Sequence, residues 1–224
     1  MLGAWLGDVT LDRFIESYLG REALARNGSI ASPRALFGWR DLADVLANEQ
    51  AESFVVGAGE LVSMPPPRDY ETLVALLSSG AGVFVRDAER AHPRLAALAA
   101  SFAPELGAAR VQIFATPGGT HGFRWHYDDE DVFVAQLAGI KDYYLRENTI
   151  ARGERARSNV FARFRDETST LQLATLERGD FLYIPSRWWH MAESRQTALS
   201  LSIGLRVSAS PDLHAARTHT DQAM

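Results

Sequence analysis

Apolar residues in the first half of the chain recur with the spacing of one helix face, and polar or glycine residues mark where the helices would begin and end. In the first stretch Thr10 is a typical N-cap and Gly20 a typical end point. We expect helices within the ranges 10–20, 38–49, 69–80 and 92–106. β-branched residues bounded by glycine or proline predict short strands between them, at 52–57, 59–64 and 81–87.

From Ala109 onward the pattern changes to a dense series of short apolar or alternating segments, separated by glycine, proline and charged turns. The expected strands are 109–117, 121–128, 131–139, 141–148, 169–177, 179–185, 187–194 and 197–207. So many short strands in so few residues are typical of a sandwich or a barrel. The polar segment that follows them is too short to form another domain.

The 224-residue chain is acidic, with 28 Asp and Glu against 23 Lys and Arg and a formal charge of -5. This balance gives no bulk attraction to a phosphate backbone, so we expect no nucleic-acid partner. The chain has no cysteine, which excludes disulfides and thiolate metal sites and is typical of a reducing cytoplasm, where we expect the protein to act. Its start has no basic leader and no long apolar stretch, so we expect neither a signal peptide nor a membrane span.

The segment HYDDEDVFVAQLAGIKDYYL, from His126 to Leu145, puts a histidine and an aspartate two residues apart before an apolar run. On a strand, His126 and Asp128 would share one face, and Tyr127 would point the other way. A second histidine, His190, starts another expected strand after a Pro-Ser-Arg turn. Two imidazoles and one carboxylate suit Fe(II), with positions left open for other ligands, and they also suit Mn(II), Co(II) or Zn(II).

Each of these residues also has an ordinary structural interpretation. A lone histidine on a strand usually serves as a hydrogen-bonded structural residue, and the acidic run 129–131 is typical of a solvated hairpin connection. The three residues together favour a metal, because burying a carboxylate among apolar strands costs on the order of several kcal/mol unless a cation or donors compensate it. Five aromatic residues lie near these three in the sequence: Trp125, Tyr127, Phe133, Trp188 and Trp189. We favour core packing as their role, and the alternative is that they shield the metal from water.

HYDDEDVFVAQLAGIKDYYL and the later GDFLYIPSRWWHMAES resemble the JmjC or cupin-like oxygenases that depend on Fe(II) and 2-oxoglutarate. The resemblance is especially to the ribosomal oxygenases and to the asparaginyl hydroxylase that acts on hypoxia-inducible factor. It implies a mainly β fold with helices, a double-stranded β-helix or jelly-roll barrel with an N-terminal α/β extension. We therefore expect flanking helices and strands at 1–108, the JmjC or cupin barrel at 109–207 and a C-terminal tail at 208–224. The dimerisation and winged-helix domains of the ribosomal oxygenases are not expected in this chain.

The resemblance makes His126, Asp128 and His190 the iron ligands and Lys141 the anchor for the distal carboxylate of 2-oxoglutarate. Lys141 would start the strand after the next turn, where a long ammonium side chain can reach a dicarboxylate that chelates the metal. A rival anchor is Arg206, since many other 2-oxoglutarate enzymes place an arginine on the last strand.

Three positions depart from the family pattern. Gln112 and Phe114 stand where the relatives commonly carry asparagine and tyrosine, and Gly204 stands where they carry serine or asparagine. Gln112 can keep an amide in the cosubstrate site, so it is included as a cofactor-binding candidate. Together these three changes would leave more space near the metal. Arg124 and Arg187 are candidates for gripping a substrate, with a plain surface role as the alternative.

The activity implied by the resemblance is hydroxylation of an amino-acid side chain, at the β-carbon, in a protein or peptide substrate. Dioxygen would be consumed, and succinate and CO2 released. A ribosomal protein and a natural-product precursor peptide are both reasonable targets. Two alternatives stay open: a cupin metalloenzyme that does not use 2-oxoglutarate, such as an isomerase or another dioxygenase, and a non-catalytic barrel scaffold. The sequence also leaves the oligomeric state open, a homodimer included.

Overall fold

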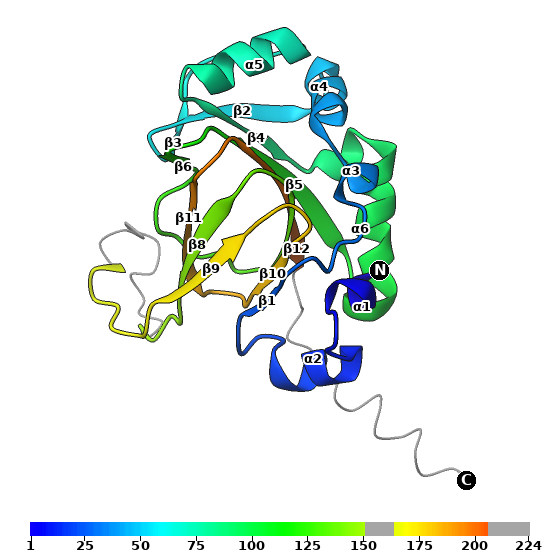
Figure 1. The fold of residues 1–224 in the computed structure, drawn as a ribbon, viewed down its shortest axis with the longest axis vertical. Coiled ribbons are helices and arrows are strands. Elements are labelled where there is room, and N and C mark those ends of the chain that lie inside the picture. Colours follow the sequence, from blue (N-terminus) through cyan, green and yellow to red (C-terminus); the bar gives the residue numbers. More distant parts are fainter. Residues whose placement is uncertain (151–163, 206–224) are drawn as a thin grey trace.

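Two antiparallel β-sheets form the framework of the protein (Figure 1). The computed structural model describes residues 1–150 and 164–205. The larger sheet has eight strands, in spatial order β1 (Leu24–Arg26), β10 (Phe181–Ile184), β7 (Asp131–Ala138), β12 (Ala198–Leu205), β5 (Ala109–Thr116), β4 (Gly82–Arg86), β2 (Glu52–Gly57) and β3 (Glu60–Val62). The smaller sheet has the order β6 (Thr120–His121), β11 (Trp189–Ser194), β8 (Lys141–Arg146) and β9 (Gln172–Leu176). The chain crosses between the sheets after β5, β6, β7, β9, β10 and β11, as a double-stranded β-helix requires.

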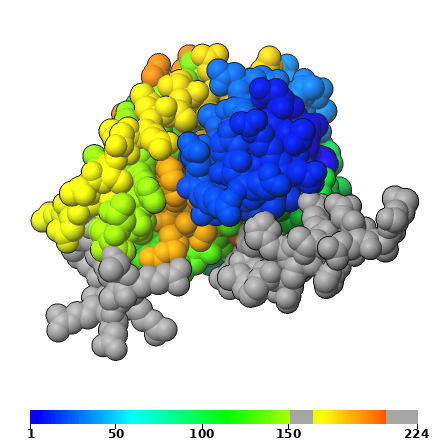
Figure 2. Space-filling model, turned by 90° about the horizontal axis from the view of Figure 1, so that it is seen from below, coloured from blue at the N-terminus to red at the C-terminus, as the bar shows by residue number. Residues whose placement is uncertain are grey.

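The helices pack against the larger sheet rather than the smaller one (Figure 1). They are α1 (Leu2–Trp5), α2 (Leu11–Ser17), α3 (Pro33–Leu36), α4 (Trp39–Ala47), α5 (Tyr70–Ser78), α6 (Pro93–Leu106) and the 3-10 helix η1 (Ala88–Arg90). Figure 2 shows the N-terminal residues, in blue, as one continuous mass beside the later strands in yellow and orange. Among the described residues, no helix is both long and apolar enough to cross a membrane.

The alternation of side chains along β5 divides an apolar core from a polar interior. Val111, Ile113 and Ala115 are buried in the cluster that joins the larger sheet to the helices. Gln112 and Phe114, between them, point into the space between the two sheets. The inner side of the larger sheet is therefore free to carry functional side chains.

Most of the elements expected from the sequence are present. The four expected helices are α2, α4, α5 and α6, and α2 ends earlier than Gly20. Two of the caps form: the Thr10 side chain accepts a hydrogen bond from the backbone N–H of Arg13 at 3.2 Å, and Asp69 accepts one from the N–H of Thr72 at 2.8 Å. The prediction of a mainly β fold with helices is confirmed.

The strand expected over 121–128 is wrong for most of its length. Only β6 and an isolated bridge between His126 and His190 are paired there. The sequence pattern also did not indicate α1, α3, η1 or β1, because elements of three or four residues span about one period or less of any repeat.

The N-terminal region contributes strands to the same sheet as the barrel. β1, β2, β3 and β4 all lie within residues 1–108, and β4 pairs with β5 while β1 pairs with β10. The division of the chain at residue 108 stays a prediction. The expected tail at 208–224 and the rival anchor Arg206 lie outside the described residues.

Candidate metal centre and cosubstrate cavity

His126, Asp128 and His190 come together at one point between the two sheets. Each offers one ligand atom, and these atoms all lie within 4.8 Å of one another. The carboxylate Oδ2 of Asp128 is 3.5 Å from Nε2 of His190, and the two imidazole ring centroids are 4.2 Å apart. A single divalent cation can contact all three side chains at this spacing.

The backbone fixes the two histidines opposite each other. The N–H of His126 donates to the carbonyl of His190 at 3.1 Å, and the N–H of His190 donates back at 2.8 Å. Residues paired in this way project their side chains from the same face of a ladder. The N–H of Arg187 also donates to the carbonyl of Asp128 at 2.7 Å, which holds the carboxylate segment beside the start of β11. The β-bridge and this further hydrogen bond therefore position the two histidines and the aspartate, which the sequence had predicted to lie on a regular strand.

Both imidazoles are oriented by a hydrogen bond at the nitrogen away from the site. Nδ1 of His126 lies 2.6 Å from the carbonyl of Arg124, and Nδ1 of His190 lies 3.0 Å from the carbonyl of Trp188. A carbonyl only accepts, so each Nδ1 carries the proton, a tautomer assigned from these partners. The lone pair of each Nε2 is then available to a metal. Metal-bound histidines usually have a similar hydrogen bond at their other ring nitrogen.

The charges of the three groups also suit a cation. Burial, followed by the neighbouring His190, lowers the pKa of His126 to about 4, so this imidazole is neutral at pH 7. Burial raises the pKa of Asp128, but its interactions with His190 and His126 outweigh that effect and the pKa is lowered overall. At neutral pH the site holds a carboxylate and an imidazole ready to coordinate.

The three residues line one cavity of about 300 Å³. Lys141 and Gln112, the two cosubstrate candidates, line it as well. Its aromatic walls are Phe84, Phe114, Phe123 and Tyr143. None of the five aromatic residues near the ligands in sequence borders it: Trp188 packs in the inner cluster and Phe133 in the helix-side core, so core packing holds for both.

Lys141 is the only lysine of the chain, and it is buried inside this cavity with 3% of its surface exposed. Within the described residues its ammonium group has neither an ion pair nor a hydrogen bond, and its Nζ lies 5.8 Å from the ring centroid of Phe114. Burial lowers its pKa from 10.5 to about 7. An uncompensated buried amine is costly unless an anion joins it, so the position points to an anionic ligand.

The departures from the family pattern have different consequences. Gln112 lines the cavity from β5, so its amide is available there. Phe114 lines the same wall, but it lacks the hydroxyl of the tyrosine that the relatives carry. The space expected at Gly204 is not free: a Cβ placed there would collide with the carboxylate of Glu130. At Gly204 the expected extra space is therefore absent, because the Glu130 side chain occupies it.

Three hydroxyl residues line the cavity, and of these the sequence pattern indicated Ser202 but neither Tyr143 nor Ser200. Tyr143 stands two positions after Lys141 and thus on the same face of β8, and Ser200 and Ser202 line the wall from β12. Burial raises the pKa of Tyr143 to about 12, so its hydroxyl stays protonated and can donate a hydrogen bond. Alternation from Lys141 was the signal that could have found it.

Glu167 is a second missed residue, outside the cavity. Its buried carboxylate accepts from the backbone N–H groups of Thr149, Thr168 and Ser169 at 2.9 to 3.0 Å, and from the indole Nε1 of Trp189 at 3.2 Å. Burial raises the pKa of Glu167, but the hydrogen bonds from Ser169 and Thr149 outweigh that effect and lower the pKa to about 2. The carboxylate fastens the segment between β8 and β9 to the residue next to His190.

We expect Glu167→Gln to lower the free energy of unfolding by about 1–3 kcal/mol at pH 7, because buried N–H groups lose a charged acceptor. Since the folded pKa is lowered, the carboxylate's contribution is complete above pH 4.5 and is lost as the pH falls toward 2. Urea unfolding at several pH values measures both effects. Asp166→Asn, at the exposed neighbour, is the control, and equal stability of the two variants at pH 7 would contradict the assignment.

The fold and the donor set define a cupin-like barrel protein with a candidate mononuclear metal centre. A model described as the JmjC domain matches residues 87–213, more than half of the chain. The chain therefore belongs to the JmjC domain family.

Relatives of the chain include several ribosomal oxygenases, as the sequence resemblance predicted. Human ribosomal oxygenase 1 is 28% identical over 206 residues, which cover 87% of this chain and 32% of that protein. The bifunctional lysine-specific demethylase and histidyl-hydroxylase NO66 of Dictyostelium discoideum is 37% identical over 100 residues, covering 42% of this chain and 18% of that protein. The chain thus spans a third or less of the length of these relatives.

The fold matches solved structures of a bacterial ribosomal oxygenase. YcfD of Escherichia coli, in complex with cobalt and 2-oxoglutarate, aligns with a TM-score of 0.67 at 19% identity, over 95% of this chain and 56% of that one. The same protein with cobalt and succinic acid gives 0.68 at 19% identity, over 95% and 55%. The predicted double-stranded β-helix is confirmed by this likeness.

Proposed function

We propose that the protein is an Fe(II)- and 2-oxoglutarate-dependent oxygenase that hydroxylates an amino-acid side chain in a protein or peptide. The observation that carries the proposal is one cavity that holds both a candidate metal triad and the chain's single, buried lysine. Membership of the JmjC family and the likeness to ribosomal oxygenases support the same activity. The lack of cysteine supports a cytoplasmic location.

His126, Asp128 and His190 would hold the iron. Bound there with 2-oxoglutarate, Fe(II) supplies the activation of dioxygen and the oxidation of a substrate C–H bond. Nδ1 of each histidine keeps its proton on a backbone carbonyl, which leaves Nε2 as the ligand atom. Three protein donors leave coordination positions for the cosubstrate and dioxygen.

Lys141 would pair with the distal carboxylate of 2-oxoglutarate. Its desolvated ammonium gains an anion, and the anion gains a charge-assisted hydrogen bond in a site with little competing water. The Tyr143 hydroxyl, on the same strand face, and the Gln112 amide are further donors to the cosubstrate. Phe114 and Phe123 keep water from the reacting atoms.

Ribosomal proteins are the first substrates to test, because several relatives are ribosomal oxygenases. Precursor peptides of natural products remain the second group. A cupin metalloenzyme that does not use 2-oxoglutarate is not favoured, because Lys141 would then have no anionic partner. A non-catalytic scaffold is not favoured, because it would not need the three clustered metal-ligand residues.

The proposal is tested by mass spectrometry of ribosomal proteins and candidate peptides incubated with Fe(II), 2-oxoglutarate and the enzyme. We expect the gain of one oxygen on a side chain, with formation of succinate, and neither with Asp128→Ala. Asp129→Ala, which removes the exposed neighbouring carboxylate, is the matched control and should stay active. Loss of a methyl group in place of oxygen gain would replace hydroxylation by demethylation, and turnover without 2-oxoglutarate would refute the cosubstrate.

A further inference from the structure

The last strand of the larger sheet, β3, exposes large apolar side chains beside the cavity. Leu61 and Val62 are 47% and 38% exposed, and Met64, just beyond the strand, is 52% exposed. β3 pairs with β2 along one side only, and its other side is unpaired in the described sheet. Exposed apolar strands at a sheet edge are normally protected by charged residues or covered by another segment. The exposed edge of β3 is therefore a candidate binding surface.

The apolar residues stand on both faces of the strand. Leu61 lines the cavity that holds the metal triad, and Val62, the next residue, points to the opposite face. A partner lying flat on the sheet would cover only one of them. An extended chain added alongside β3 would cover both, because its own side chains alternate in the same way.

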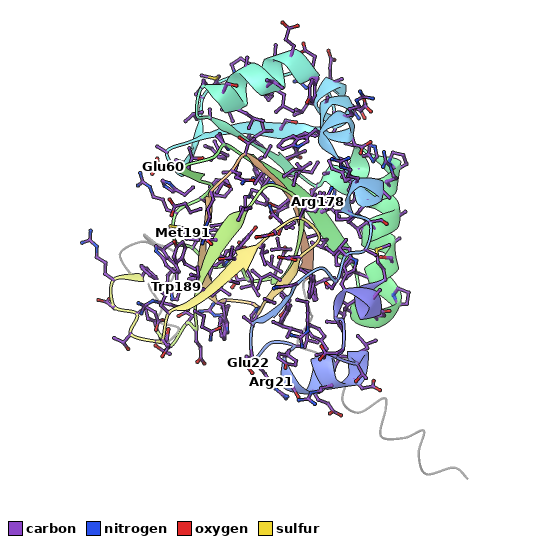
Figure 3. All side chains as sticks on the ribbon, in the orientation of Figure 1. Arg21, Glu22, Glu60, Arg178, Trp189 and Met191 are labelled. Carbon is purple, nitrogen blue, oxygen red and sulfur yellow. The ribbon has the colours of Figure 1, made fainter. Side chains whose placement is uncertain are left out.

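β3 is also fastened to the segment that carries the first histidine ligand. The carboxylate of Glu60 is 3.1 Å from Nη1 of Arg124, whose carbonyl orients His126. A Cβ at Gly59, in the turn before β3, would lie 3.0 Å from the ring of His121, so this turn is closely packed on β6. Glu60 is labelled in Figure 3, at the outer edge of the molecule in that view. The edge therefore has a fixed place relative to the metal centre.

We propose that the unpaired edge of β3 binds an extended segment of the protein substrate as an additional strand, with an apolar side chain on Leu61. The inference rests on the proposed function, and it names how the substrate is held. Because strand side chains alternate, the residue on Leu61 and the residue that enters the cavity share one face. They are therefore separated by an even number of positions in the substrate.

The test uses a positional-scanning library of short synthetic peptides and the enzyme loaded with Mn(II) and 2-oxoglutarate. We expect selection of an apolar residue at an even separation from the residue in the cavity, and slower amide hydrogen exchange at residues 60–62. Leu61→Glu should weaken binding of the selected peptides about tenfold, the loss expected for one buried apolar side chain. Leu173→Glu, at a 58% exposed leucine on β9, should leave it unchanged.

Three outcomes would overturn the proposal. They are an absence of apolar selection, equal peptide binding by Leu61→Glu and Leu173→Glu, and peptide binding without protection of β3 amides. Conversion of a dimer into a monomer by Leu61→Glu would show that a second copy covers the edge, and this too would overturn it. Cosubstrate affinity is measured in parallel: failure to bind 2-oxoglutarate would refute the proposed function, while peptide selection by β3 would still be scored separately.

Discussion

Replacement of His126 by alanine is expected to weaken Fe(II) binding by about 100-fold or more and to abolish 2-oxoglutarate-dependent succinate formation. Loss of an outer contact to a metal ligand already costs about 10- to 100-fold in affinity or activity, and His126 would be a direct ligand. Its Nε2 is one of three donor atoms within 4.8 Å, and the described residues offer no further group of three such donors to replace it. Isothermal titration with Fe(II) under anaerobic conditions measures the affinity.

The control for this variant is His121→Ala. His121 lies five positions earlier, lines a neighbouring cavity of about 210 Å³ and is not among the three clustered donors. It should keep the wild-type affinity for Fe(II). Equal affinities of wild type and His126→Ala would remove this histidine from the metal centre.

Replacement of Lys141 by methionine is expected to weaken 2-oxoglutarate binding by about 100-fold or more. Removing one partner of a buried charge pair costs about 3–5 kcal/mol, and about 1.4 kcal/mol corresponds to a factor of ten. Methionine keeps an unbranched side chain of similar length, so the cavity wall stays filled. The same change should raise the free energy of unfolding of the unliganded protein by about 1 kcal/mol or more, because a buried amine disappears. Cosubstrate titration and urea unfolding measure the two effects.

The pH dependence provides an independent signature of Lys141. Its pKa of about 7 in the free protein means that the amine loses its proton above that pH, whereas a bound dicarboxylate favours the charged form. The 2-oxoglutarate affinity should therefore fall as the pH rises above about 7, and the Lys141→Met variant should show no such fall. Since Lys141 is the only lysine, one NMR signal from 13C-labelled lysine reports its titration directly. An unshifted titration near pH 10.5, or no response to 2-oxoglutarate, would contradict the anchor.

The sequence indicated the donors of the site better than it indicated the backbone that positions them. A histidine and an aspartate two residues apart predicted side chains on one side, and both do line the cavity. The regular strand assumed beneath them is one bridge from His126 to His190, closed by two backbone hydrogen bonds. A long-range pair of this kind depends on residues 64 positions away, so no local period reveals it.

Other features depended on long-range packing and could not be predicted. Glu167 was ordinary in sequence, because the four residues that donate its five hydrogen bonds come from three separate segments of the chain. Gly204 suggested open space, since the sequence does not reveal that Glu130 fills it. Phe84 and Phe123 line the cavity although neither lies next to a ligand, whereas Trp188, two positions before His190, is in the core. Closeness in sequence was thus a poor guide to which aromatic rings line the cavity.

The measurement that tests the central claim most directly is an anaerobic titration of the protein with Fe(II) in the presence of 2-oxoglutarate, followed by visible absorption. The account predicts one iron per chain and a weak metal-to-ligand charge-transfer band that is lost with His126→Ala and weakened with Lys141→Met. No band in the wild type, or a band of equal strength in all three proteins, would contradict an iron centre built from these residues.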